Sequence, residues 1–382
     1  NLHFTHVQKT DDPSKDRLVR PIVDAIREKC KLHYIPTPTV SVDESTISFK
    51  GKISFKIYNP QKPTKFGMKI FVLSDSSNGY IYNFQPYIGK GTVPESDLLK
   101  TTQIVKNLCS SLIKDTVNPP IGYHIYTDRY YTSPQLADEL LQMNMVSTGT
   151  VMTNRRGIPD EIKGVGKKMK KGDVLAYRKG NQLVLSWKDK RVVTMLSTKH
   201  TGSKNEMTLV TSKHPNRPPT MKPNVIVDYT KHMGGVDRSD HFIASYQFMR
   251  RTRKWYRKVF FWLLEVSIVN SYLLYVTFQN SQQKKPITHK QFRQRLVESL
   301  VKDKVTGQLE RQKPGRAIQG PPDERLTGRH FMRRKEKGRG KCVVCKQKGE
   351  RKETIYFCNV CTRKPYLHPD ICFETYHTLK NY

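Results

Sequence analysis

The sequence predicts an α/β protein that ends in a separate metal-binding segment, and three observations indicate this. Stretches of alternating apolar residues are interspersed with stretches in which apolar residues recur at helical spacing. One predicted strand, which ends at Asp128, is followed by a helix and several further strands. Five of the seven cysteines crowd into residues 342–372. A chain of 382 residues is long enough for about two or three domains.

The composition favours a polyanionic partner and excludes global disorder. The chain carries 68 Lys and Arg against 33 Asp and Glu, a net charge of +35, and the positive charge is spread along its length. Such a protein is expected to bind nucleic acid, or less often an anionic membrane. Because 36% of the residues are hydrophobic, well-packed cores are expected.

The most apolar stretch, VFFWLLEVSIVNSYLLYV at 259–276, is predicted to be a buried core helix. Glu265, Ser267, Asn270 and Ser271 interrupt it, so that its longest apolar run is six residues. A membrane span needs about 20 predominantly apolar residues. No membrane partner is therefore expected.

The first third of the chain alternates between helix and strand patterns. Apolar residues recur at helical spacing over 15–33, and residues 45–60 alternate like paired strands with a turn at Gly51. The stretches KFGMKIFVLSD and GYIYNFQPYIG are predicted to form a hairpin through SSNG, and residues 98–113 are predicted to form a helix.

The middle of the chain has the pattern of the α/β core. After the strand that ends at Asp128, a helix is expected to begin with Ser133 as its cap and Pro134 in its first turn. Four more strands are predicted in MVSTGTV, DVLAYRK, QLVLSWKD and RVVTMLSTKH. Residues 201–223 are rich in Pro, Lys, Ser and Thr and are expected to form a loop, and helical spacing resumes after Gly235.

Two aspartates lie beside a glycine pair in KHMGGVDRSD, residues 231–240. Cleavage of a phosphodiester by two divalent metals needs several carboxylates at one point, with the ions about 3.5–4 Å apart. Asp128 is fixed by a strand end, Asp237 follows glycines that permit a tight turn, and Asp240 lies on the same helical face. Carboxylates suit Mg²⁺ or Mn²⁺. The alternative is that each acid caps a helix or faces its dipole.

The cysteine cluster has the spacing of a zinc module. Two C-x2-C pairs lie a dozen residues apart, and their thiolates suit tetrahedral zinc in a reducing compartment. The candidate ligands are Cys342, Cys345, Cys358, Cys361, His368, Cys372 and His377. Seven ligands exceed the four that one ion needs and fall one short of two sites, so one or two Zn²⁺ are expected. We favour a cross-braced pair, in which the first C-x2-C pair shares an ion with His368 and Cys372 or with His377.

Several basic stretches favour DNA contact over an ordinary solvated face, because the whole chain is so strongly positive. MRRTRKWYRK, residues 249–258, places six basic residues around two aromatic rings. The candidate DNA-binding residues are Arg155, Arg156, Lys168, Lys170, Arg250, Arg251, Arg253, Lys254, Arg257, Arg333 and Arg334. KKMKK and RRKEKGRGK are also candidate nuclear-localisation patches, and the nucleus is the expected compartment.

Together these motifs resemble a piggyBac-family DNA transposase. The resemblance rests on SVDESTISFKGK, YTDRYYTSPQLADELL, GTVMTNRRGIP, SWKDKRVVTMLSTKH, VDYTKHMGGVDRSD, KWYRKVFFWLLEVSIVNSYLLY and CFETYHTLKNY, in that order along nearly the whole chain. It implies an RNase H-like core with three catalytic aspartates, cleavage through hairpin intermediates and insertion at TTAA. It also implies a homodimer on double-stranded DNA and a cysteine-rich domain that binds transposon ends.

Carried over by position, the resemblance makes Asp128 the first catalytic aspartate and Asp237 the third, with Asp240 beside it. The second is expected just after the strand in VVTMLSTKH, where this chain has no aspartate. Asp189, in a W-x-D pattern, is the preferred second acid and Glu206 is the alternative. The competing role for Asp189 is that of a turn residue between two strands.

The expected function is metal-dependent cut-and-paste transposition. The predicted domains are a mostly helical dimerisation and DNA-binding domain in two parts, 1–121 and 243–302, an RNase H-like core at 122–242 with an insertion near 201–223, a basic linker at 303–340 and a zinc domain at 341–382. Two alternatives stay open. One is a catalytically inactive, domesticated DNA-binding or chromatin-targeting protein on the same scaffold, and the other is a zinc-dependent protein-interaction module on an unrelated basic scaffold.

Overall fold

The chain divides into two compact units, residues 1–298 and 299–382. The computed structural model describes residues 14–60, 64–113, 122–165, 168–203, 206–211, 219–309, 324–326 and 328–379.

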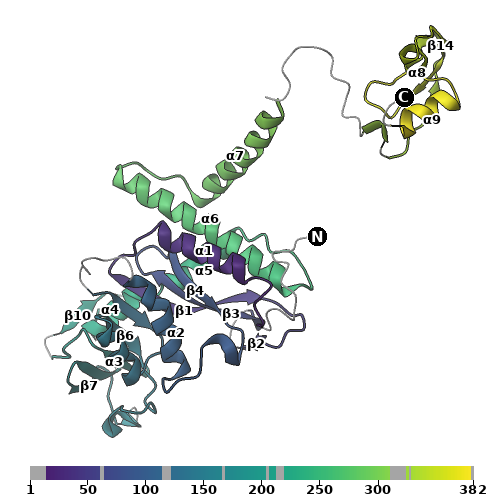
Figure 1. The fold of residues 1–382 in the computed structure, drawn as a ribbon. Coiled ribbons are helices and arrows are strands. Elements are labelled where there is room, and N and C mark those ends of the chain that lie inside the picture. Colours follow the sequence, from purple (N-terminus) through teal and green to yellow (C-terminus); the bar gives the residue numbers. More distant parts are fainter. Residues whose placement is uncertain are drawn as a thin grey trace. The chain divides into compact units, whose positions relative to one another are not determined.

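The first unit is built on a large mixed sheet with helices packed against it (Figure 1). Its strands are β1 (Thr39–Ser48), β2 (Ile57–Tyr58), β3 (Phe66–Asp75), β4 (Ile81–Pro86), β5 (His124–Thr127), β6 (Val146–Thr150), β7 (Val174–Lys179), β8 (Gln182–Lys188), β9 (Val192–Ser197), β10 (Met207–Val210) and β11 (Thr220–Pro223). Its helices are α1 (Arg20–Leu32), α2 (Lys100–Cys109), α3 (Pro134–Gln142), α4 (Asn224–His232), α5 (Gly235–Ser245), α6 (Trp255–Ser281) and the start of α7 (His289–Leu309).

Within the described residues, nine strands form one sheet in the order β2-β3-β1-β5-β6-β9-β8-β7, with β4 paired to β3. The neighbours β1, β5 and β6 are parallel, and the flanking strands β3 and β9 run antiparallel to them. Parallel strands need a crossover, and α3 provides it between β5 and β6. The Ser133 hydroxyl caps that helix by accepting a hydrogen bond from Leu136 N at 3.1 Å, as predicted.

Helices cover both faces of the sheet. α2 and α3 pack on each other, and they contact β3, β4 and β6. α4 packs on β1, β6 and β9, and α5 packs on β1 and β3. Successive side chains of a strand point to opposite faces. Tyr126 of β5 therefore faces α4, whereas Ile125 joins the core that contains Leu140 of α3.

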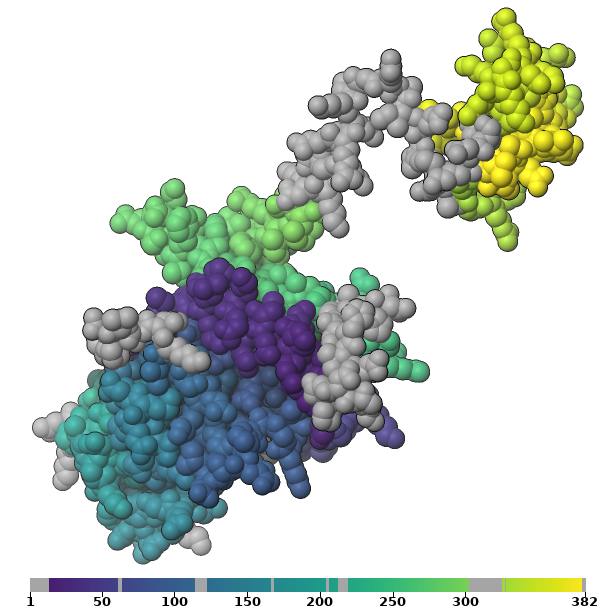
Figure 2. Space-filling model, in the orientation of Figure 1, coloured from purple at the N-terminus to yellow at the C-terminus, as the bar shows by residue number. Residues whose placement is uncertain are grey.

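The apolar stretch after residue 255 forms the predicted core helix, α6. Its 27 residues are long and apolar enough to cross a membrane by length and composition alone, but Val266 and Val269 are fully buried in the main core. The polar Glu265 is buried as well, and it pairs with Arg293 of α7 at 2.7 Å. α1 (purple) packs against α6 (green), as both views show (Figure 1, Figure 2).

The second unit is small and is organised around its cysteines. Its elements are β12 (Met332–Arg334), β13 (Gly340–Lys341), α8 (Val343–Gln347), β14 (Glu353–Thr354), β15 (Tyr356–Cys358) and α9 (Ile371–Thr378). β12 pairs with β15 and β13 with β14, both antiparallel. Among its core residues, Cys342, Cys358 and Leu367 are completely buried. A core this small needs metal to supply folding free energy.

The hairpin through SSNG, the helix in 98–113 and the four strands after Asp128 are confirmed. Other pairings are corrected, because periodicity identifies a strand but does not show its partner. β1 pairs with β3 and β5, and it does not form a hairpin with the strand after Gly51. The predicted loop at 201–223 contains the antiparallel pair β10 and β11.

Two predicted boundaries are also corrected. Strands β1 to β4, residues 39–86, belong to the same sheet as β5, so 1–121 is not the first part of a separate helical domain. The predicted linker at 303–340 is structured at both ends, because α7 continues to Leu309 and β12 and β13 belong to the second unit. Residues 310–323 of that linker lie outside the described residues.

Candidate active site and metal centres

The register of β1 and β5 brings two aspartates together. Val42 pairs with Thr127 across the parallel strands. The next residues along each strand, Asp43 and Asp128, are therefore neighbours at the point where β5 ends and β1 continues. Asp128 lies at a strand end as the sequence predicts, whereas Asp43 is a member of the site that sequence reasoning missed.

The glycine pair places a third aspartate on a closely packed helix. A Cβ at Gly235 would lie 2.5 Å from Ser41 Oγ and 2.6 Å from Ser74 Oγ, so only glycine lets α5 approach β1 and β3 this closely. A Cβ at Gly234 would meet nothing within 4 Å. Asp237 follows in the first turn of α5, where it is exposed. Gly235 therefore permits close packing of α5, the helix that carries Asp237, on β1 and β3.

The three carboxylates interact electrostatically. Burial, together with the charges of neighbouring acids that include Asp128 and Asp237, raises the pKa of Asp43 to about 7. Burial also raises the pKa of Asp128. The pKa of Tyr229 on α4 is raised to about 12, mainly by burial, and the charges of Asp43, Asp128 and Asp237 all contribute. Carboxylates that disfavour one another's ionisation form a site that a cation stabilises.

Asp240 lies one turn further along α5 and fastens the helix to the sheet. Its Oδ1 accepts a hydrogen bond from Ser45 Oγ at 2.6 Å. Ser45 is two residues after Asp43 on β1 and points to the same face. The predicted acid at 240 is therefore close to the site and holds α5 against the strand that carries Asp43.

The preferred second acid, Asp189, does not join this cluster, and its assignment is corrected. It lies in the turn between β8 and β9, where its N–H donates to Arg191 O at 3.2 Å. Asp128 is level with Thr150, which pairs with Met195, so the turn is reached four residues beyond that level, about 13 Å along the strand. Asp189 thus has the competing role, that of a turn residue.

The alternative second acid, Glu206, is engaged in its own loop. Its carboxylate accepts hydrogen bonds from Thr201 Oγ1 and from Gly202 N, the latter at 3.1 Å. The hydrogen bond from Thr201 lowers the pKa of Glu206. Neither acid therefore joins Asp128 and Asp237, whereas Asp43 is the neighbour of Asp128 across the two strands.

The donor set of Asp43, Asp128 and Asp237 suits a hard divalent cation, because carboxylate oxygens are the ligands that Mg²⁺ and Mn²⁺ prefer. Among the described residues, the groups of possible ligands whose atoms all lie within 4.8 Å of one another are found in the second unit, so these three carboxylates are spaced more widely than the candidate zinc ligands. Asp43 and Asp128 are half-buried and Asp237 is exposed, so the site opens to the surface.

The predicted DNA-binding residues fall in three regions. Arg155 lies beside the acids, because its Nη2 donates to Tyr130 O at 2.6 Å, two residues after Asp128. Trp255 packs edge-on against Phe55 with ring centroids 5.2 Å apart, so its ring belongs to the core. The exposed candidates are Arg156, Lys168 and Lys170 before β7, Arg250, Arg251, Arg253 and Lys254 before α6, and Arg333 and Arg334 on β12, while Arg257 is half-buried.

Among the residues that the structure describes, the second unit contains two sets of four candidate zinc ligands. One set is Cys342, Cys345, His368 and Cys372, and the other is His330, Cys358, Cys361 and His377. The two sets interleave along the chain, as in the predicted cross-brace. The first C-x2-C pair shares its site with His368 and Cys372, which is the first of the two predicted pairings.

The ligand atoms are spaced for tetrahedral zinc. Zn–S and Zn–N distances of about 2.3 and 2.0–2.1 Å imply S···S and S···N separations of about 3.8 and 3.6 Å. Cys345 Sγ lies 3.8 Å from Cys372 Sγ and 3.5 Å from His368 Nδ1. In the other set, Cys361 Sγ lies 3.5 Å from His330 Nδ1. Both sets therefore fit a zinc ion.

His330 is the ligand that sequence reasoning missed. It lies outside any C-x2-C pair, in the stretch assigned to the linker, so the predicted start of the zinc domain at residue 341 is too late. The available signal was the odd number of candidates, since two four-ligand sites need eight.

Comparisons with known proteins agree with both units. A family profile described as "Transposase IS4" matches residues 1–272, and one described as "DDE_Tnp_1-like zinc finger" matches residues 325–378. The human "PiggyBac transposable element-derived protein 3" is 28% identical over 386 residues, which cover 99% of this chain and 62% of that protein. The human "PiggyBac transposable element-derived protein 2" is 28% identical over 288 residues, 72% of this chain and 46% of that protein. The chain thus spans about three fifths of the length of the first of these relatives.

The fold has a match among solved structures. The chain superimposes on "Cryo-EM structure of piggyBac transposase synaptic complex with hairpin DNA" with a TM-score of 0.67 and 24% identity, over 91% of this chain and 72% of that one. The mixed sheet with helices on both faces is accordingly an RNase H-like core, followed by a cysteine-rich zinc finger. Because the transposase profile covers well over half of its residues, and the relatives named above are piggyBac-derived, the chain belongs to the piggyBac family of transposases.

Proposed function

We propose that this protein is a DNA transposase of the DDE/D type in which Asp43, Asp128 and Asp237 hold two divalent metal ions. The observation that supports this most is the convergence of three carboxylates from β1, the end of β5 and α5, within electrostatic reach of one another. The family profile supports the reaction class, phosphoryl transfer on DNA.

The chain contributes fixed positions for the carboxylates. Bound Mg²⁺ or Mn²⁺ would activate a water or 3′-hydroxyl and stabilise the leaving oxygen. Asp43 and Asp128 are held on neighbouring strands, and close packing at Gly235 holds Asp237 near them. The exposed side of the site admits a duplex from the surface. Because a metal-activated oxygen is the nucleophile, no Ser or Tyr of the protein needs to bond to DNA.

Basic residues would hold the DNA at this site. Arg155 lies beside Asp128, and the exposed basic residues before α6 add positive charge, so both would contact phosphates. Arg333 and Arg334 are exposed on β12 of the second unit, which would bind the transposon ends. The products would be those of the family, hairpin ends followed by insertion at TTAA.

Paired ends require two active sites, so we propose a homodimer in the nucleus. Exposed apolar side chains on α7 support self-association: Val297 is 59%, Leu300 61% and Val301 55% exposed. The basic stretches KKMKK and RRKEKGRGK support nuclear import.

Nicking of DNA that carries the terminal repeats flanking this coding sequence tests the proposal. The wild type is expected to cut in Mg²⁺ or Mn²⁺, and Asp43→Asn, Asp128→Asn and Asp237→Asn should each reduce cutting to background. Asp189→Asn is the matched control and should cut like the wild type, because the turn holding it lies away from the site. Normal cutting by Asp43→Asn would refute this set of ligands.

A catalytically inactive DNA-binding protein on the same scaffold is the second candidate. The names of the human relatives, which describe them as "transposable element-derived", favour it. The missing aspartate after VVTMLSTKH does not, because Asp43 supplies the third carboxylate. Tight binding of the terminal repeats by the wild type, with no cleavage in either metal, would establish this alternative.

A further inference from the structure

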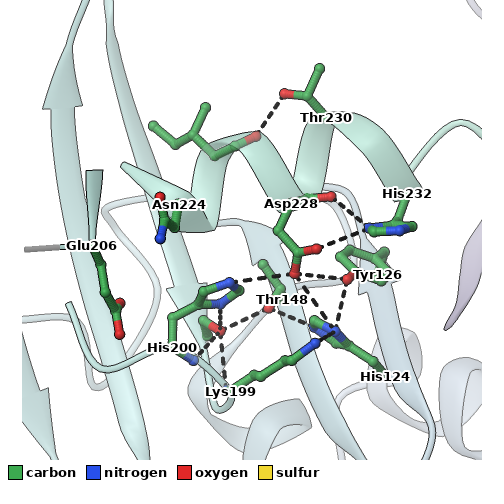
Figure 3. A network of polar contacts seen from close by, with 12 residues as sticks. His124, Tyr126, Thr148, Lys199, His200, Glu206, Asn224, Asp228, Thr230 and His232 are labelled. Carbon is green, nitrogen blue, oxygen red and sulfur yellow. Dashed lines mark hydrogen bonds and ion pairs between the residues drawn. The ribbon is translucent and has the colours of Figure 1, made fainter. Parts of the chain in front are cut away.

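Asp228 of α4 is the centre of a polar network that joins three strands to the helix (Figure 3). Its Oδ2 accepts a hydrogen bond from Tyr126 OH at 2.8 Å and lies 3.4 Å from His200 Nε2. Its Oδ1 lies 3.0 Å from Nδ1 of His232, one turn along the same helix. His124 Nδ1 lies 3.8 Å from Oδ2 and 2.7 Å from Tyr126 OH.

Hydroxyl groups close the network behind the histidines. His124 Nε2 lies 2.8 Å from Thr148 Oγ1, which lies 2.7 Å from Ser197 Oγ. Ser197 Oγ in turn lies 2.9 Å from His200 Nδ1. The contacts therefore run from β5 through β6 and β9 back to Asp228. The Asp228 network consists of Asp228, His124, Tyr126, Thr148, Ser197, Lys199, His200 and His232.

The strand side of the network is buried, whereas Asp228 on the helix is half-buried and charged. Tyr126 and Thr148 are fully buried, and His124 is 3% exposed. Burial disfavours ionisation of Asp228, but hydrogen bonds from His200 and Tyr126 outweigh it and hold the pKa of this carboxyl well below its usual range. Burial lowers the pKa of His124 to about 3, so its imidazole is neutral. A half-buried anion with several donors makes strong, directional bonds that resist movement.

These residues do not form a metal site of their own. His124 Nε2 and His200 Nδ1, the ring nitrogens on the side away from Asp228, are already in hydrogen-bond contact with hydroxyl groups. The ammonium of Lys199 lies 3.4 Å from His124 Nδ1, where it would repel a cation. The arrangement is suited to holding secondary structure in place.

The network lies between the chain segments that carry two of the acids. Tyr126 is two residues before Asp128 on β5 and points to the same face. Asp228 is on α4, which leads through two residues into α5 and Asp237. Tyr229 is the next residue on α4, and the charges of the acidic site contribute to its raised pKa. The bond from Tyr126 to Asp228 therefore links the position of Asp128 to that of Asp237.

We propose that the Asp228 network positions Asp128 relative to Asp237 and thereby sets the affinity of the acidic site for divalent metal. This inference rests on the proposed function only in requiring that the acids bind metal. Asp228 touches no proposed ligand and acts through the backbones of β5 and α4, so it is a positioning residue. Replacing outer residues that orient metal ligands typically costs about 10–100-fold in metal affinity or activity.

Binding of Mn²⁺ to the full, zinc-loaded chain, measured by electron paramagnetic resonance, tests this without requiring cleavage. Asp228→Asn keeps the side-chain shape and removes the charge, and Tyr126→Phe removes one hydroxyl. Each is expected to weaken Mn²⁺ binding by about tenfold or more. Asp128→Asn identifies the signal of the acidic site. Asp160→Asn, at a side chain that is 87% exposed, is the matched control and should bind Mn²⁺ like the wild type.

The unfolding temperature of each variant separates positioning from a general loss of structure. Folded variants that bind Mn²⁺ as tightly as the wild type would overturn the inference, and Tyr126→Phe decides the matter if Asp228→Asn does not fold. Mn²⁺ binding by the wild type without DNA cleavage would refute the proposed catalysis and leave the role of the network intact. A wild type that binds no Mn²⁺ through Asp128 would refute both.

Discussion

Asp43 is an acidic residue inside a strand, and the local environment opposes its charge. Burial and nearby carboxylates raise its pKa to about 7, although aspartate in model peptides titrates near about 3.9. Such shifts are concentrated at functional sites, where a cation or substrate compensates for them. Ionised Asp43 therefore costs folding free energy, and its position beside other carboxylates favours the binding of a metal ion.

The raised pKa of Asp43 predicts that its contribution to stability falls as pH rises. Without Mg²⁺ or Mn²⁺, the folded chain keeps the Asp43 proton until about pH 7, whereas the unfolded chain releases it near about pH 4. The contribution is therefore largest below about pH 4 and is lost by about pH 7. Urea unfolding of zinc-loaded wild type and Asp43→Asn between pH 5 and 8 should show the variant gaining stability relative to the wild type. A difference that does not change with pH would contradict this.

Gly235→Ala should weaken the packing of α5 on the sheet. The new Cβ would lie 2.5 Å from Ser41 Oγ and 2.6 Å from Ser74 Oγ, and both serines lie on central strands. Overpacking of this kind costs about 1–3 kcal/mol in the free energy of unfolding, and cleavage should fall because Asp237 shifts. Gly234→Ala is the neighbouring control, since its Cβ meets nothing within 4 Å. Equal stability of the two variants in urea would argue against close packing at Gly235.

At the scale of elements, strand register decides which acids meet. Asp128 and Asp237 could be predicted because a strand end and a glycine pair mark them locally. Asp43 could not, because its place in the site depends on pairing between β1 and β5, which are far apart in sequence. The same limit explains the error at Asp189, whose W-x-D pattern is local while its distance from the site is set by β6 and β9.

A buried ion pair joins helices α6 and α7, and it provides a test at the scale of elements. Glu265 of α6 is fully buried and its carboxylate lies 2.7 Å from Arg293 Nη1 of α7. Arg293→Met leaves an unpaired buried charge and should cost about 3–5 kcal/mol in the free energy of urea unfolding. Combining it with Glu265→Leu should recover most of that loss. Lys163→Met, which breaks an exposed pair with Asp160, is the control and should leave the free energy of urea unfolding essentially unchanged.

At the scale of the whole molecule, removal of zinc should unfold the second compact unit, which holds both ligand sets, and leave the first unit folded. Metal analysis of purified protein should find two Zn²⁺ in the wild type and a clear loss at one site in His330→Ala, because His330 completes the second set. His33→Ala, at an exposed histidine after α1, should keep both ions. Two Zn²⁺ in purified His330→Ala would exclude it as an essential ligand.

The zinc module shows how far whole-molecule organisation follows from sequence. The spacing of the C-x2-C pairs is a signal within the local sequence, so the module and its cross-brace could be predicted. His330 has no such spacing, and only the pairing of β12 with β15 carries it to Cys358. The large sheet has the same limit. Periodicity predicts strands in the region of β1 to β4, but it does not show that they belong to the sheet of the core.

The interleaving of the two ligand sets also affects synthesis of the chain. The first set ends with Cys372 and the second with His377, so both wait for the last part of the module to leave the ribosome. A product that ends before Cys372 has neither set complete, because each set still lacks its last ligand. Incomplete translation that stops short of this residue would therefore yield a module with no complete zinc site.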